Sequence, residues 1–335
     1  MIPLENRRIA LIGGAGFIGH NLALALRSRG AEVSVLDGLE VNNLLHYTTN
    51  APFPERRTLY LRMINERLDM LRDAGIPLHV LDARNFYALR DALREIRPQA
   101  IVQLAAVAHA ARSNKEPRGS FEHSMSTLEH ALECAREGVE HFVYFSSSMV
   151  YGNFADGYVT EQTQCEPLGI YGALKFGGEK LVIAYNQVFG FPYTIVRPSA
   201  LYGERCVSRR VGQLFIESAM QGKELVVHGD GSECLDFTYV GDLVQGLVRV
   251  LDREASHNET FNLTYGQGRS VADLAGIVKQ HFPNTTLRYE PKDRLNPERG
   301  TLVIDKAKSL LGYNPEFPIE KGFVRYIEWY KRFWA

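Results

Sequence analysis

The feature that most constrains this chain is a short apolar run over residues 8–12, followed by a cluster of glycines. A run without polar alternation predicts a buried parallel strand. The spacing of Leu22, Ala25 and Leu26 then predicts a helix. Glycines between the two allow a tight turn and bring backbone close to a diphosphate at the helix N-terminus. The residues of the predicted dinucleotide site are Gly13, Gly14, Gly16, Phe17, Ile18 and Gly19.

Asp37 follows a second predicted strand, residues 32–36. A carboxylate at this place accepts hydrogen bonds from a ribose diol. It suits a free 2′-hydroxyl and repels a 2′-phosphate, and the next residues, Gly38 and Leu39, supply no cation. We therefore expect NAD rather than NADP. A glycine-rich turn in some other α/β protein is the alternative interpretation.

Composition excludes several classes of protein. A net charge of −1 over 335 residues argues against bulk binding of nucleic acid or anionic membranes. No apolar run approaches membrane-spanning length, and residues 1–7 lack the core of a signal peptide. The four cysteines show no metal-ligand spacing. We expect a cytoplasmic protein with free thiols and no metal site.

Further strands are predicted over residues 77–82, 100–104, 141–145 and 193–196, with helices between them. This alternation predicts an α/β fold with a Rossmann-type, doubly wound parallel sheet. We expect residues 1–198 to form the NAD-binding domain, with a partly helical insertion at about 40–76. Residues 199–335 are expected to form a smaller C-terminal α/β lobe for substrate, intermingled with the first domain.

Tyr171 and Lys175 have helical i, i+4 spacing, which brings a phenol and an ammonium to one face. An isolated phenol has a pKa of about 10, and a nearby cation favours the phenolate. Such a pair can supply the general acid–base that hydride transfer to or from an alcohol needs. It follows the fifth predicted strand and the hydroxyls of residues 146–148, at the sheet edge where ligands bind.

Together these motifs resemble the extended short-chain dehydrogenase/reductases of the nucleotide-sugar epimerase/dehydratase group, from residue 8 to about residue 323. The markers in chain order are GGAGFIG at 13–19, Asp37, Asp82, Leu104-Ala105-Ala106, FSSSMVYG at 145–152, Tyr171 with Lys175, Arg197-Pro198, Tyr202-Gly203, GDG at 229–231 and DFTYV at 236–240.

The resemblance implies a role for each marker. Ser147 falls at the family's catalytic serine or threonine, and Tyr171 would be the acid–base. Lys175 would bind the nicotinamide ribose and lower the pKa of Tyr171. Asp82 would contact the adenine of NAD. The remaining implied NAD contacts are Ala83, Leu104, Ala105, Ala106 and Pro198.

The resemblance also narrows the reaction. In the 4,6-dehydratases of this family an Asp-Glu pair follows the catalytic threonine, whereas Ser148 and Met149 stand here. A thioether cannot transfer a proton, so dehydration is disfavoured. Residues 103–113 keep the spacing seen in UDP-sugar 4-epimerases. We expect an NAD-dependent epimerase at C4 of a nucleoside-diphosphate sugar, acting through a transient 4-keto intermediate. A net C4 oxidoreductase and a non-catalytic cofactor-binding protein are the alternatives.

Several positions bear on the substrate. Arg299 resembles the family's phosphate-binding arginine, with a solvated loop residue as the alternative. The other candidate substrate contacts are Ala108, His109, Ser148 and Arg205. His109 can equally be an ordinary loop histidine, and Ser148 can instead satisfy backbone at the strand end. Three family residues are replaced: Ala200 and His123 stand for asparagines, and Leu235 stands for an arginine.

The resemblance also implies a homodimer. In relatives, helices equivalent to residues 120–136 and 171–189 pair across a two-fold axis into a four-helix bundle. The apolar residues predicted to form this surface are Leu128, Leu132, Leu174, Leu181 and Val182.

Overall fold

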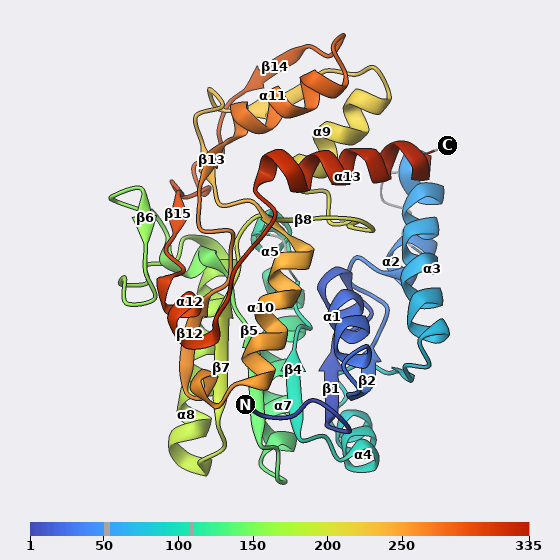
Figure 1. Ribbon diagram of the computed structural model, residues 1–335, viewed down its shortest axis with the longest axis vertical. Helices are drawn as coiled ribbons and strands as arrows, with labels where there is room; N and C mark the ends of the chain where they lie inside the picture. Colours follow the sequence, from blue (N-terminus) through green and yellow to red (C-terminus); the bar gives the residue numbers. More distant parts are fainter. Residues whose placement is uncertain (50–53, 108–109, 335) are drawn as a thin grey trace.

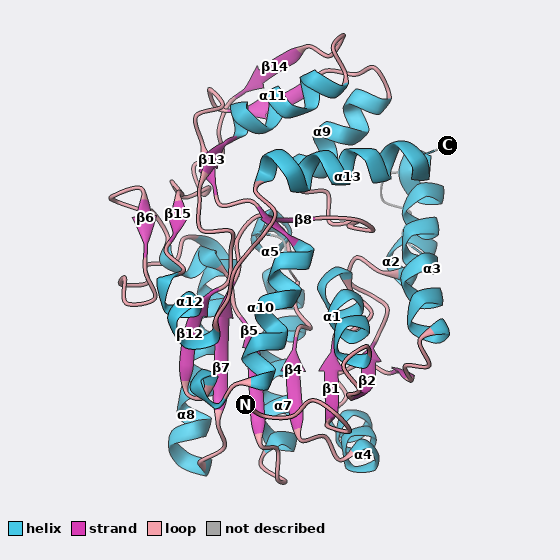
Figure 2. Ribbon diagram, viewed as in Figure 1, coloured by secondary structure: helices cyan, strands magenta, loops and turns pink. Residues whose placement is uncertain are grey.

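The computed structural model describes residues 1–49, 54–107 and 110–334. At its centre lies a seven-stranded parallel sheet in the order β12-β7-β5-β4-β1-β2-β3 (Figures 1 and 2). The strands are β1 Arg8–Ile12, β2 Glu32–Asp37, β3 Leu78–Val80, β4 Ala100–Gln103, β5 His141–Phe145, β7 Tyr193–Arg197 and β12 Glu259–Asn262. The predicted Rossmann-type fold is confirmed. The strand order reverses between β1 and β4, which is where such sheets bind ligands.

Helices cover both faces of this sheet because successive strand residues point to opposite sides. Ile9 and Leu11 of β1 belong to one core, with α1 (Phe17–Arg27) and α10 (Val240–Asp252). Ala10 and Ile12 belong to the other, with α4 (Phe86–Ile96), α7 (Thr127–Ala135) and α8 (Gly169–Phe189). In Figure 1, α1 and α10 lie in front of the sheet. Both cores leave the carboxyl ends of the strands available for a site.

Two elements differ from their predicted bounds. The helix predicted over residues 120–136 begins earlier and is not α-helical throughout: the chain forms α6 (Pro117–Phe121), a π-helical turn (η2, Glu122–Ser126) and then α7. Pro117 starts the helix early because proline favours the first helical position. β3 is shorter than predicted because it is an edge strand that pairs only with β2.

The insertion after β2 is helical, as predicted, and consists of α2 (Leu44–Thr49), η1 (Pro54–Arg56) and α3 (Arg57–Asp73). It is tied to α9 (Val211–Met220) through the buried carboxylate of Glu217. Oε2 of Glu217 accepts hydrogen bonds from Arg56 Nε at 3.0 Å and Tyr60 Oη at 2.9 Å. Its Oε1 accepts from Gln213 Nε2 at 2.8 Å and from Tyr330 Oη at 2.9 Å. The insertion therefore joins the front of the chain to its last helix.

The remaining elements are short and lie mostly after residue 199. They are α5 Ala110–Lys115, η3 Ser148–Tyr151, β6 Tyr158–Val159, β8 Leu201–Tyr202, β9 Leu225–His228, β10 Cys234–Leu235, β11 Thr238–Tyr239, η4 Glu254–Ser256, β13 Arg269–Ser270, α11 Val271–His281, β14 Leu287–Glu290, β15 Thr301–Leu302, α12 Asp305–Leu311 and α13 Ile319–Trp334. Within the described ranges, no helix combines the length and the apolar character needed to cross a membrane. The division into domains at residue 198 stays a prediction.

Candidate active site

A cavity of about 200 Å³ opens at the carboxyl ends of β1, β2 and β4. Most of the predicted NAD-binding residues line it: Gly13, Gly16, Phe17, Ile18, Gly19, Asp37, Asp82, Ala83, Leu104, Ala105 and Ala106. The lining also includes residues that were not predicted, among them Glu40, Asn42, Arg67, His123, Thr127, Ser208 and Arg210. Glu40 and Asn42 lie in the loop that follows β2, at the sheet edge where ligands bind. Their position could therefore have identified them as site residues. Arg67 comes from the insertion, where no sequence signal marked it.

The glycine turn fits a dinucleotide diphosphate. Gly13 has a φ of +80°, and a Cβ there would lie 2.6 Å from the amide nitrogen of Ala105. Only glycine therefore lets this turn pass so close to the end of β4. α1 begins after Gly16, and no side chain of the described residues caps it. Its first amide groups are thus available to an anion at the positive end of the helix.

Asp37 is held beside this turn by two backbone amides. Oδ2 accepts a hydrogen bond from Ala15 N at 3.0 Å and Oδ1 accepts one from Leu39 N at 2.7 Å. Burial raises the pKa of Asp37, and these two bonds oppose the rise. The carboxylate oxygens keep lone pairs for the hydroxyls of a ribose.

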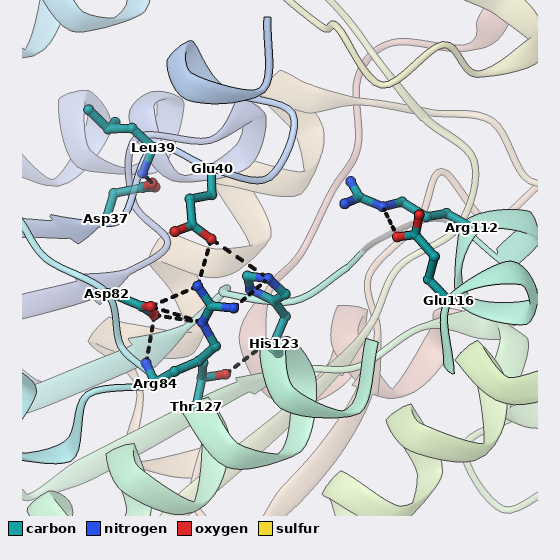
Figure 3. Close-up of polar contacts among 9 residues, drawn as sticks. All are labelled: Asp37, Leu39, Glu40, Asp82, Arg84, Arg112, Glu116, His123 and Thr127. Atoms are coloured by element: carbon teal, nitrogen blue, oxygen red, sulfur yellow. Dashed lines mark hydrogen bonds and ion pairs between the residues drawn. The ribbon is translucent and has the colours of Figure 1, made fainter. Parts of the chain in front are cut away.

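A polar cluster occupies the Asp82 side of the cavity, centred on Arg84 (Figure 3). Arg84 Nε donates to both carboxylate oxygens of Asp82 at 2.9 Å, and Nη2 donates to Glu40 Oε2 at 2.8 Å. His123 Nε2 lies 3.2 Å from Arg84 Nη1. Burial acts to raise the pKa of Asp82, but the bonds from Arg84 outweigh it and hold the value below its usual range. The groups around this part of the cavity are therefore fixed in position.

Ser147, Tyr171 and Lys175 lie where α8 packs on the carboxyl end of β5. Lys175 Nζ donates to the carbonyl oxygen of Phe145 at 2.6 Å. A Cβ on Gly172 would lie 2.8 Å from the carbonyl oxygen of Met149, so the start of α8 rests directly on η3. Tyr171 is 8% exposed and Ser147 is 7% exposed, so both are largely shielded from solvent.

The surroundings of Lys175 shift the pKa of its ammonium group. Burial lowers its pKa to about 8, and Glu179, one turn along α8, opposes this change. Glu179 forms a buried ion pair with Arg197, with its two oxygens 2.6 and 2.9 Å from Nη2 and Nε. Ser146 Oγ also donates to Glu179. The hydroxyl of Ser146 therefore supports this ion pair.

The predicted substrate residues have different surroundings. Arg299 donates to Glu233 at 3.3 Å, and its buried Nε has no hydrogen-bond partner among the described residues. Arg205 contacts Glu66 at 3.1 Å and His20 at 3.2 Å. Ser148 is buried, and its amide donates to Pro198 O at 2.9 Å. Ala108 and His109 lie outside the described residues.

Of the three replaced positions, His123 lines the cavity, whereas Ala200 and Leu235 are not among its lining residues. Ala200 has a φ of +36°, in the left-handed region that alanine rarely occupies. Leu235 is buried in β10. His123 and Thr127 reach the cavity from η2 and the start of α7, and Thr127 Oγ1 donates to the carbonyl of His123 at 2.8 Å.

Comparison with known proteins agrees with this geometry. The model of the NAD dependent epimerase/dehydratase family matches residues 9–264. The chain belongs to this family. It is therefore an enzyme whose cofactor is NAD, and the glycine turn, the available end of α1 and Asp37 fit that cofactor.

Relatives within the epimerase/dehydratase family act on nucleotide sugars according to their names. A Bacillus subtilis protein, the uncharacterized UDP-glucose epimerase YtcB, is 34% identical over 207 residues, which span 61% of this chain and 65% of that protein. A putative UDP-glucose 4-epimerase of Methanocaldococcus jannaschii is 28% identical over 96% of this chain and 98% of its own length. Other matches are named dTDP-glucose 4,6-dehydratase and UDP-glucuronic acid decarboxylase.

Solved structures of the family share the whole fold. The UDP-glucuronic acid 4-epimerase of Bacillus cereus, in complex with UDP-glucuronic acid and NAD, has a TM-score of 0.83 at 25% identity, covering 97% of this chain and 99% of that chain. The family and the nucleotide-sugar class of its relatives are thus established. The names of these relatives differ in both reaction and sugar.

Asp37→Ala is expected to narrow the preference for NAD over NADP. The substitution removes the negative charge that faces a 2′-phosphate, together with the acceptor for the 2′-hydroxyl. Dissociation constants for both cofactors, measured by calorimetry on cofactor-free protein, test this. Equal affinity of the unmodified enzyme for NAD and NADP contradicts the assignment of Asp37.

Proposed function

We propose that the enzyme is an NAD-dependent nucleotide-sugar epimerase that inverts C4. The observation that carries the proposal is the combination of Ser147, Tyr171 and Lys175 at the end of β5 with the buried thioether of Met149 beside them. The first three suit oxidation and reduction at a hydroxyl-bearing carbon. Met149 provides no proton transfer for loss of a second hydroxyl. The names of the epimerase relatives support the same choice.

In this mechanism Tyr171 accepts the proton of the C4 hydroxyl through its phenolate oxygen as C4 loses a hydride and becomes a ketone. After the sugar has turned, Tyr171 returns a proton to this oxygen as hydride adds to the opposite face of C4. Ser147 Oγ hydrogen-bonds the same oxygen and orients it. The Lys175 ammonium, held on the carbonyl of Phe145, would donate to the nicotinamide ribose and places a positive charge on the face of α8 that carries Tyr171. NAD, when bound, supplies the acceptor and donor of the hydride. Arg299 contributes a guanidinium with an unused Nε for a substrate phosphate.

The test begins with a thermal-shift panel of UDP-, GDP-, CDP- and dTDP-sugars in the presence of NAD, because a specific ligand raises the melting temperature. The best ligand is then incubated with purified enzyme without added cofactor, and the products are followed by NMR. The C4 epimer, formed without net NADH, is the expected product. NADH accumulating in step with an oxidised sugar indicates a net oxidoreductase, and a 4-keto-6-deoxy sugar indicates a dehydratase.

We propose further that the enzyme is a homodimer, with an interface that differs from the predicted residues. Leu128, Leu132 and Val182 are fully buried and pack inside the protomer against the second core, so they were wrong as interface residues. α8 instead carries an apolar stripe at alternating spacings of four and three residues. Its members, all partly or fully exposed, are Ile170, Leu174, Gly177, Leu181, Ala184 and Val188. This spacing suits helix pairing across a two-fold axis.

Light scattering at micromolar concentration is expected to give the mass of a dimer. Leu181→Glu places a charge at the centre of the α8 stripe and should shift the protein to monomer. Lys279→Glu, on the exposed side of α11, is the control and should leave the mass unchanged. A monomer for the unmodified protein refutes the dimer, and a dimer that survives Leu181→Glu refutes this interface.

A further inference from the structure

Arg67 is a buried arginine of the insertion that lines the cofactor cavity. Its residue is 1% exposed, on the side of α3 that faces the core. Nε donates to the carbonyl oxygen of Arg205 at 2.9 Å, and Nη2 donates to the same oxygen. The cavity lining places Arg67 with Gly16, Phe17 and Ser208. A cation from α3 therefore lies in the wall of the cavity that the turn between β1 and α1 also lines.

The charge of Arg67 lacks an ion-pair partner within the described part of the chain. Its hydrogen bonds go to a neutral carbonyl, and no carboxylate lies within ion-pair distance. Burial is the main reason that its pKa is lowered to about 10; Cys206, Tyr47 and Asp37 oppose this change, and Arg205 adds to it. A buried charge without a counter-charge is unfavourable. The cavity that Arg67 lines is therefore suited to an anion.

A second observation places that anion. α1 begins at this cavity without a capping side chain, so its first amides also need acceptors. α3 packs against α1, and Arg67 of α3 lines the cavity together with Gly16 and Phe17 at the start of α1. The positive end of α1 and Arg67 thus face the same space. Asp37 lies beside the same turn, where its Oδ2 accepts from Ala15 N at 3.0 Å, but among the described residues it forms no ion pair with Arg67 and does not cap α1.

We propose that Arg67 binds the diphosphate of the dinucleotide, so that the insertion completes the cofactor site. The inference rests on the cofactor orientation given by the glycine turn and Asp37. The same guanidinium ties the chain near Arg205 to the cavity, so α3 joins that segment to the diphosphate. Glu217, which anchors α3 through Arg56 and Tyr60, keeps Arg67 in place.

Calorimetric titration of cofactor-free enzyme with NAD, ADP and adenosine tests the proposal. Arg67→Met should weaken the affinity for NAD and ADP by about 10- to 100-fold, as expected for a lost charge-assisted hydrogen bond, and leave that for adenosine within about twofold. Arg67→Lys keeps the charge and should retain most of the ADP affinity. Arg62→Met is the matched control: it changes an exposed arginine on the same helix that stacks on Phe333, and should bind all three ligands like the unmodified enzyme.

Two results overturn the assignment. If Arg67→Met binds ADP as tightly as the control does, Arg67 does not contact the diphosphate. If it loses adenosine and ADP equally, or if Arg67→Lys loses as much as Arg67→Met, Arg67 acts only by holding the backbone of Arg205. Should Arg67→Met not fold, Arg67→Gln is measured in the same way. Failure of the unmodified enzyme to bind ADP instead contradicts the cofactor placement itself.

Discussion

Replacing Tyr171 with phenylalanine is expected to lower kcat by about 10²- to 10⁴-fold, the usual contribution of a positioned general acid–base. The substitution keeps the ring and removes only the oxygen that titrates. NAD should therefore still bind, and the packing of α8 on η3 should survive. Measurement of kcat on the substrate identified by the ligand panel checks this, with the bound cofactor quantified in the same sample.

Lys175→Ala is measured in the same way, by kcat and by the amount of bound cofactor. It should lower both turnover and NAD affinity, because the proposed mechanism uses the ammonium beside Tyr171 and at the ribose. If Tyr171, Lys175 and Ser147 serve one transition state, as we propose, the double variant of Tyr171 and Lys175 should lose far less than the product of the single losses. Near-normal turnover of Tyr171→Phe with NAD bound removes Tyr171 from the chemistry. Multiplicative losses instead show that the two residues act independently.

Replacing Arg197 with methionine is expected to lower the free energy of unfolding by about 3–5 kcal/mol, the range seen when one partner of a buried ion pair is removed. The reason is that the buried Glu179 carboxylate loses its ion-pair partner and, among the described residues, retains the hydrogen bond from Ser146. Urea denaturation provides the measurement. Glu179 lies on α8 one turn from Lys175 and opposes the fall in the pKa of Lys175 that burial causes, so this substitution also alters the surroundings of Lys175.

The surface pair Arg94–Glu137 provides the control for Arg197. Its atoms are 2.7 Å apart, but both side chains are about half exposed. Arg94→Met should therefore cost less than about 1 kcal/mol, as exposed ion pairs do. Combining Arg197→Met with Glu179→Gln should recover part of the loss, because no buried charge then remains unpaired. Equal losses of unfolding free energy in Arg197→Met and Arg94→Met contradict the larger contribution assigned to the buried pair of Glu179 and Arg197.

Local sequence rules were sufficient for the sheet and much of the cofactor cavity. A glycine turn between an apolar strand and a helix, and an acid at the end of the next strand, are defined by neighbours along the chain. The sequence alone was therefore enough to predict Gly13, Asp37 and the Tyr171–Lys175 spacing. Their contacts with ligand stay predictions.

The remaining features depend on packing between distant segments. Arg67 reaches the cavity only because Glu217, 150 positions further along, anchors α3. The π-helical turn that carries His123 has no local signature comparable to a glycine turn. Apolar residues on α7 and α8 mark helix faces, but they do not tell which face turns inward. For this reason Leu128, Leu132 and Val182 were placed on the surface although they belong to the core.

The left-handed backbone at Ala200 has a consequence for the redesign of this loop. An alanine in this conformation is strained by roughly 1–2 kcal/mol, whereas asparagine tolerates it well. The backbone thus already has the shape that suits the asparagine of the related enzymes, although the side chain differs. Ala200→Asn is therefore expected to relieve backbone strain at this position, with no remodelling of the loop.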